Sequence, residues 1–158
     1  MRKRSSYRPK GVRLDNLSWI KAGFAKVGNL PKAGIELKLK NHEALDSILN
    51  GTATRDHIDV LIAAMNMAEA FYLVNPDLGF DWKDEIKAAQ DAIFTMSRRG
   101  LKHGKILFTG LEMQAVKLGM DVHDTQLDNA QVRELEKALD VVANVIKNKK
   151  ARAIVEPA

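Results

Sequence analysis

The stretch from Thr54 to Asn75, TRDHIDVLIAAMNMAEAFYLVN, constrains the fold of this chain more than any other segment. It predicts a helix of about twenty residues that begins at the N-cap Thr54 and stops before Pro76. On a helical wheel its apolar side chains fill most of the circumference, and only a narrow strip is polar. Such a helix must be surrounded by others, so we expect a central rod in which Met67 and Phe71 are nearly fully buried. Its internal Arg, Asp and Glu residues argue against a membrane span.

Composition indicates one soluble domain. A chain of 158 residues with 46% hydrophobic and 28% charged residues is long enough to bury a real core. The absence of Cys excludes a disulfide framework and a thiolate metal site. No apolar run reaches about 18 residues, and the N-terminus lacks the apolar middle of a signal peptide. We therefore expect a cytoplasmic protein.

The net charge of +5 is concentrated at the two ends of the chain. Residues 1–13 contain six cations and no acid, and the last twelve residues are also basic. The body from residue 14 to 146 is consequently net negative, at −4. The basic character of the chain therefore belongs to its ends and not to its fold.

Two short helices are expected before the central one. Residues 14–27 have apolar residues at helical spacing, and residues 42–50 form a second segment between the N-cap Asn41 and Gly51. Between them, residues 35–40 alternate strictly between apolar and charged side chains, which is typical of a strand. With no second strand in the sequence to pair with it, an extended linker or a helical lead-in is the better interpretation.

Three long helices should follow the central one. The first starts at Phe80–Asp81 and ends at Gly100, with one apolar stripe; its members are Trp82, Ile86, Ala89, Ala92, Ile93 and Met96. The second starts at the capping box Thr109–Glu112, with Phe108 and Met113 as its hydrophobic staple, and runs to about residue 124. The third is expected to be capped by Asp128, with a staple between Leu127 and Val132.

These segments predict an all-α protein, a compact helical bundle of four long and two short helices with a basic N-terminal arm. The expected boundaries are 1–13 for the arm, 14–152 for a single helical domain and 153–158 for a short tail.

The basic arm, MRKRSSYRPKGVR, is the first candidate site. Its cations suit the neutralisation of phosphates in DNA or RNA, and its one aromatic residue suits a stacked base. These residues are Arg2, Lys3, Arg4, Tyr7, Arg8, Lys10 and Arg13. Two alternatives stay open: a tail that docks on the acidic body of its own or another copy, and a tail that is only solvated.

The segment from Ser97 to Lys105 is the second candidate. Its cations Arg98, Arg99, Lys102 and Lys105 cluster at a helix C-terminus, beside two glycines that can adopt positive φ. The functional interpretation is a phosphate or anion site. The structural one is that these cations complement the helix macrodipole, which explains the two arginines equally well. The glycine spacing of a P-loop is absent.

Two further features have weaker functional interpretations. Phe94 lies off the apolar stripe among cations, where an aromatic side chain can stack on a base, although such residues more often pack on a neighbour. Glu69 and His123 are a candidate buried polar pair, since His123 lies on an inward strip and needs a partner. A structural pair is more common than a general acid–base pair.

No metal-ligand spacing, nucleophile elbow or dinucleotide loop occurs, so we expect no catalytic residues, no metal and no cofactor.

Four stretches together resemble small helical proteins encoded by phages and prophages; they are MRKRSSYRPKGVRLD, IELKLKNHEAL, GTATRDHIDVLIAAMNMAEAF and GLEMQAVKLGMDVHDTQLD. The resemblance spans most of the chain. It implies a phage genome acting inside a bacterial cytoplasm, and small accessory phage proteins without catalytic motifs often bind nucleic acid or a host protein. It assigns no residue a role.

The sequence thus favours a non-enzymatic, nucleic-acid-associated accessory protein that binds the phosphate backbone of DNA or RNA through its basic arm. The alternative is a protein-interaction module that inhibits or modulates a host protein. A homo-oligomer is compatible with both hypotheses, and no membrane partner is expected.

Overall fold

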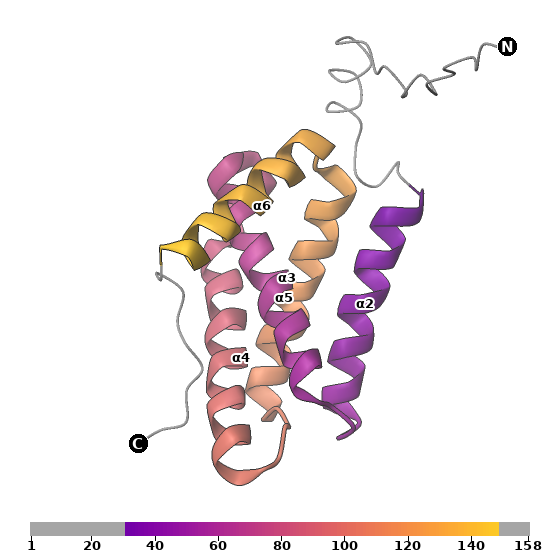
Figure 1. Ribbon diagram of the computed structural model, residues 1–158, viewed down its shortest axis with the longest axis vertical. Helices are drawn as coiled ribbons and strands as arrows, with labels where there is room; N and C mark the ends of the chain where they lie inside the picture. The colour runs from indigo at the N-terminus through magenta and orange to yellow at the C-terminus, as the bar shows by residue number, and fades with distance from the viewer. Residues whose placement is uncertain (1–30, 149–158) are drawn as a thin grey trace, which may run out of the picture.

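The computed structural model of the protein describes residues 31–148, which form an all-α bundle (Figure 1). Five α-helices and two short 3₁₀ turns follow one another in this range. They are α2 (Pro31–Leu49), α3 (Arg55–Val74), η2 (Pro76–Leu78), η3 (Phe80–Trp82), α4 (Lys83–His103), α5 (Gly110–Asn129) and α6 (Val132–Lys147). The predicted all-α bundle is confirmed for this part of the chain. The expected arm, residues 1–13, and the expected short helix, residues 14–27, lie outside the described residues.

Helix α3 is the central element, as predicted. It begins after Thr54, whose backbone N–H donates to His57 Nδ1 at 2.9 Å, and it ends before Pro76. Helices α2, α4, α5 and α6 all pack against it. Phe71 is fully buried, but Met67 is only half-buried, so the prediction for Met67 is wrong. Met67 lies at the edge of the contact with α6, where the covering is incomplete.

Among residues 31–148, α3 is also the one helix that is long and apolar enough to cross a membrane by length and hydropathy. This criterion alone is weak evidence for a span, because the core helix of a soluble protein meets it too. Four helices surround α3, and the buried face of the bundle is built on it. Its apolar character is therefore explained by its position in the core.

The core has two parts on either side of α3. The larger cluster joins α2, α3, α4 and α5 around Leu61, Met65 and Ile93. The smaller cluster joins α3, η2, α5 and α6 around Phe71 and Leu127. Residues of α3 and α5 belong to both clusters. Figure 1 accordingly shows these two helices in the middle of the bundle, between α4 and α2.

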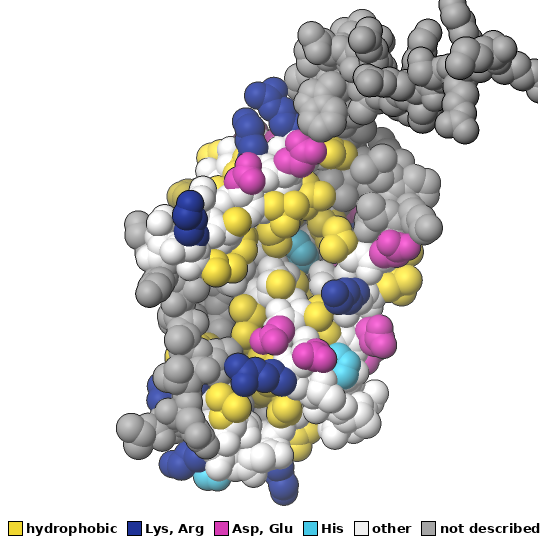
Figure 2. All heavy atoms as spheres, in the orientation of Figure 1, with side chains coloured by type: hydrophobic (Ala, Val, Ile, Leu, Met, Phe, Trp, Pro, Cys, Tyr) yellow, Lys and Arg dark blue, Asp and Glu magenta, His cyan; other side chains and the backbone are white. Residues whose placement is uncertain are grey.

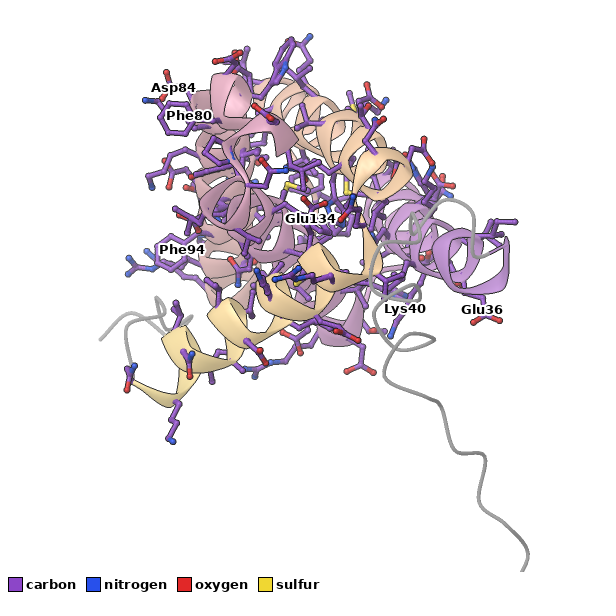
Figure 3. The ribbon with its side chains drawn as sticks, turned by 90° about the horizontal axis from the view of Figure 1, so that it is seen from above. Glu36, Lys40, Phe80, Asp84, Phe94 and Glu134 are labelled. Carbon is purple, nitrogen blue, oxygen red and sulfur yellow. The ribbon has the colours of Figure 1, made fainter. Side chains whose placement is uncertain are left out.

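Helix α2 decides between the two interpretations of residues 35–40. The segment is a helical lead-in and not an extended linker, because it belongs to one helix that continues to Leu49. Asn41 is therefore buried inside the helix and does not cap it. The first half buries no residue from position 35 to 40, so its alternation carries no burial signal. Glu36 and Lys40 point away from the bundle in Figure 3.

Helix α4 begins and ends later than predicted. Trp82 lies in the preceding 3₁₀ turn and is 48% exposed, so it does not extend the buried stripe, whereas Ile86, Ala89 and the rest of that stripe are buried. Gly100 is helical and buried, and Gly104 is the C-cap with φ +71°. Only one of the two glycines in this segment therefore uses the left-handed region that favours glycine.

The start of α5 is as predicted. Thr109 is the N-cap: its Oγ1 accepts a hydrogen bond from the Glu112 N–H at 3.3 Å, and its own N–H donates to Glu112 Oε2 at 2.8 Å. The C-terminus is different, because α5 continues to Asn129 instead of ending near residue 124. Asp128 consequently lies inside α5 and caps nothing. Helix α6 instead follows Gln131, whose N–H donates to Glu134 Oε2 at 2.8 Å.

Candidate functional site

Three exposed cations surround the C-terminus of α4. Arg98 and Lys102 lie in its last turns, and Lys105 follows the C-cap Gly104. Within residues 31–148, none of these three side chains forms an ion pair with an acid. At the lower end of Figure 2, where α4 ends, the face in view shows Lys, Arg and His side chains without Asp or Glu. This arrangement, called the α4-end cluster below, can attract an anion, but its backbone does not form a phosphate loop.

Arg99 does not belong to this cluster. Its guanidinium binds the Glu112 carboxylate with two hydrogen bonds, Nη1 to Oε1 at 2.8 Å and Nη2 to Oε2 at 2.6 Å, and also donates to the Leu107 carbonyl at 2.8 Å. These hydrogen bonds from Arg99, more than any other contact, lower the pKa of Glu112. Arg99 therefore joins the end of α4 to the start of α5, and its expected role in nucleic-acid binding stays a prediction.

Phe94 is half-buried on α4, and the Arg98 guanidinium lies 5.8 Å from its ring centroid. Figure 3 shows its side chain on the outer side of α4. The ring thus packs beneath a cation, and the side chain also lines a groove between helices. The packing interpretation of Phe94 accounts for these contacts.

That groove lies between α3, α4 and α6, and we call it the α3/α4/α6 groove. Its open volume is about 520 Å³. Helix α3 forms the floor, and α4 and α6 form the two walls; the lining residues are Ile62, Met65, Asn66, Glu69, Ala70, Leu73, Lys87, Gln90, Ile93, Phe94, Val141, Val142, Val145 and Ile146. Most of these side chains are apolar, and Figure 2 shows hydrophobic side chains gathered beside and below α6.

A short polar network crosses the groove. The Gln90 side-chain amide donates to Glu69 Oε2 at 3.0 Å and to Asn66 Oδ1 at 3.3 Å, which connects α4 to α3. Lys87 pairs with Asp91 at 2.9 Å one turn further along α4. The groove is therefore an apolar channel with one acidic group on its floor.

His123 is buried, as predicted, but its partner is not Glu69. Its Nδ1 lies 3.3 Å from Gln126 Oε1, and its ring packs 6.0 Å from the Phe71 ring. Burial lowers the pKa of His123, so the neutral form is favoured. Glu69 instead accepts from Gln90, and the expected Glu69–His123 pair is not formed. The hydrogen-bond partner of His123 is thus an amide and not a carboxylate.

Gln126 is a structural residue that sequence reasoning missed. Its buried amide donates to the Leu78 carbonyl at 2.6 Å and to the Ala68 carbonyl at 2.9 Å. It thereby joins α5 to the turn after α3. A Gln in an otherwise apolar strip was the one available signal, since a buried amide requires partners.

The groove was also missed, because three helices far apart in the sequence form it. Val141 and Val145 on α6 line it together with residues of α3 and α4 that are about 50 to 80 positions away in the sequence. Of the other sites expected from the sequence, the six cations and Tyr7 of the arm lie outside the described residues. Within residues 31–148, no group of three or more His, Asp or Glu side chains is placed to hold a metal ion.

No protein-family model matches the chain, and no match is found among curated proteins or among solved structures.

Proposed function

We propose that the protein is a non-enzymatic accessory protein that binds the phosphate backbone of DNA or RNA. The observation that carries this proposal is the α4-end cluster of Arg98, Lys102 and Lys105, which is exposed and has no ion pair within residues 31–148. It stands out on a body that is otherwise acidic, since residues 31–148 contain 14 Lys and Arg against 18 Asp and Glu. Phosphate contacts need exposed cations but no precise arrangement of them, and the cluster supplies three exposed cations.

The basic arm supplies the larger share of the expected attraction. Its six cations in thirteen residues, with Tyr7 among them, match the composition of segments that follow a nucleic-acid backbone. The arm has no framework for reading base edges, so we propose sequence-independent binding. The α4-end cluster then adds a second point of contact on the folded body.

A charge-matched pair of variants tests the contribution of the cluster. Arg98→Ala, Lys102→Ala and Lys105→Ala together remove three cations there, and the control removes three exposed cations elsewhere, Lys40, Lys117 and Lys137. Fluorescence anisotropy with a labelled DNA duplex and an RNA strand gives the affinity of each. We expect the cluster variant to lose at least about tenfold more affinity than the control. Equal losses would show that only net charge matters and would remove the cluster from the site.

A protein-interaction module is the second candidate, and the α3/α4/α6 groove favours it. An open apolar channel between helices is a common surface for docking an amphipathic helix. Leu73→Asp on the rim of the groove should then abolish the capture of a protein partner from bacterial lysate treated with nuclease. Retained capture by this variant would exclude the groove as the docking surface.

A further inference from the structure

The α3/α4/α6 groove leaves large apolar side chains in contact with solvent. Leu73 on α3 is 60% exposed and Ile146 on α6 is 61% exposed, and Val145 beside it is 38% exposed. All three line the same channel, whose lining also includes the buried residues Met65 on α3 and Ile93 on α4. Contiguous apolar exposure of this kind marks a surface that another segment covers.

The helices that line the groove indicate which end of the chain is nearer to it in the sequence. Helix α6 ends at Lys147, one residue after Ile146, which lines the groove. The described part of the chain therefore ends two residues after the groove-lining Ile146, and residues 149–158 follow it in the sequence. By contrast, residues 1–30 join the bundle at the start of α2, which packs on α3 and α5 and contributes no residue to the groove.

The length of this segment is sufficient. Ten residues in an extended conformation reach about 33 Å. The wall that α4 contributes, from Lys87 to Phe94, is about 10 Å long at the rise of an α-helix. Residues 149–158 can therefore turn back at the end of α6 and still cover the channel.

The composition of the segment KKARAIVEPA matches the groove. Ala151, Ala153, Ile154 and Val155 offer a short apolar run, and Lys149, Lys150 and Arg152 precede or interrupt it. The groove presents a mostly apolar lining with one carboxylate, Glu69, on its floor and one cation, Lys87, which pairs with Asp91, on the α4 wall. A tethered segment has an effective concentration on the order of millimolar, so even weak contacts favour the covered state.

We propose that residues 149–158 fold back into the α3/α4/α6 groove of their own chain, with Ile154 and Val155 against its apolar walls. In this arrangement the segment buries the exposed side chains of Leu73, Val145 and Ile146. This inference concerns a different surface from the α4-end cluster and does not rest on phosphate binding.

The test compares two single variants of the full chain that add the same charge to the same segment, Ile154→Asp and Ala158→Asp. Methyl NMR spectra should show shifts at Leu73, Ile93 and Val145 in Ile154→Asp and none in Ala158→Asp. The methyl of Met120, which is buried and does not line the groove, should stay unchanged in both and thereby report intact folding. If the segment covers the groove nine-tenths of the time, Ile154→Asp should raise the affinity for the apolar dye ANS about tenfold.

Two results would overturn the proposal. The first is that Ile154→Asp leaves the methyl shifts at the groove and the ANS affinity as in the unchanged chain, which would mean that the groove is open or covered by something else. The second is that the shifts at the groove depend on protein concentration, which would assign the groove to a second copy. Neither result bears on the nucleic-acid affinity, so failure of this inference and failure of the proposed function are distinguishable.

Discussion

Helix propensity alone predicts that Gly119→Ala stabilises the protein, but the close approach of α4 and α5 at Gly119 predicts the opposite. Gly119 is buried in the middle of α5. A Cβ atom at this position would lie 2.5 Å from the Cβ of Ala89 on α4 and 2.9 Å from the Sδ of Met65 on α3. The first contact cannot be relieved by a rotamer change, because a Cβ atom is fixed to its backbone. Gly119→Ala therefore requires the two helices to move apart.

The two effects can be weighed. Replacing Gly by Ala inside a helix contributes about 1 kcal/mol of stability. Overpacking of a core costs typically about 1–3 kcal/mol, and a contact between two fixed Cβ atoms belongs at the upper end of that range. We therefore expect Gly119→Ala to lower the free energy of unfolding by about 2 kcal/mol, as measured by urea denaturation followed by circular dichroism.

A second substitution and a control make the prediction specific. Ala89→Gly alone should cost about 1 kcal/mol of helix propensity. In the double variant with Gly119→Ala the propensity changes cancel and the contact disappears, so stability should return close to its original value, a coupling of about 3 kcal/mol. Gly110→Ala, where a Cβ would meet nothing within 4 Å, should be neutral or slightly stabilising. A Gly119→Ala variant as stable as the unchanged protein would refute the close approach of α4 and α5.

Four further substitutions test the core, the cap and the pH response. Phe71 is fully buried, so Phe71→Ala should lower the free energy of unfolding by about 3–5 kcal/mol; a loss below about 1 kcal/mol would make α3 peripheral. Thr109→Ala should cost about 1 kcal/mol by removing the N-cap of α5, and an unchanged denaturation midpoint would argue against the capping box. The lowered pKa of Glu112 means that its stabilisation is complete above about pH 4.5 and is lost as pH falls through the folded-state pKa, so the stability advantage over Glu112→Gln should be constant between about pH 7 and 5 and should shrink below about pH 4.5. The lowered pKa of His123 means that stability is complete above about pH 6.5 and falls as pH decreases below it, a dependence that His123→Gln should remove.

Features fixed by neighbouring residues could be predicted from the sequence. Thr109 and Glu112 are three residues apart and bond each other, so the start of α5 is readable without knowledge of the fold. The central position of α3 was also accessible, because apolar residues around the whole helix require several neighbours. Asp128 shows the limit of the same reasoning, since a residue type that favours N-caps also occurs within a helix.

Features fixed by tertiary contacts could not be predicted. The alternation from Ile35 to Lys40 has the period of a strand, but every one of these residues is at least partly exposed in a helix, so its apolar side chains report no buried face. Arg99 stands in a basic run of the sequence, and its pairing with Glu112 depends on the packing of α4 against α5. The α3/α4/α6 groove requires the crossing of three helices, which no local pattern contains.

The dependence of nucleic-acid affinity on salt is the measurement that tests the central proposal most directly. Each phosphate contact to duplex DNA contributes about −0.9 to the slope of log affinity against log salt, so six arm cations predict a slope near −5, or about −4 on single strands. The Arg98→Ala, Lys102→Ala and Lys105→Ala variant should then have a shallower slope than the charge-matched control. Deletion of residues 1–13 should abolish most of the affinity without lowering thermal stability. Failure of the full chain to bind DNA or RNA at about 50 mM salt would contradict the account and leave the protein-interaction alternative.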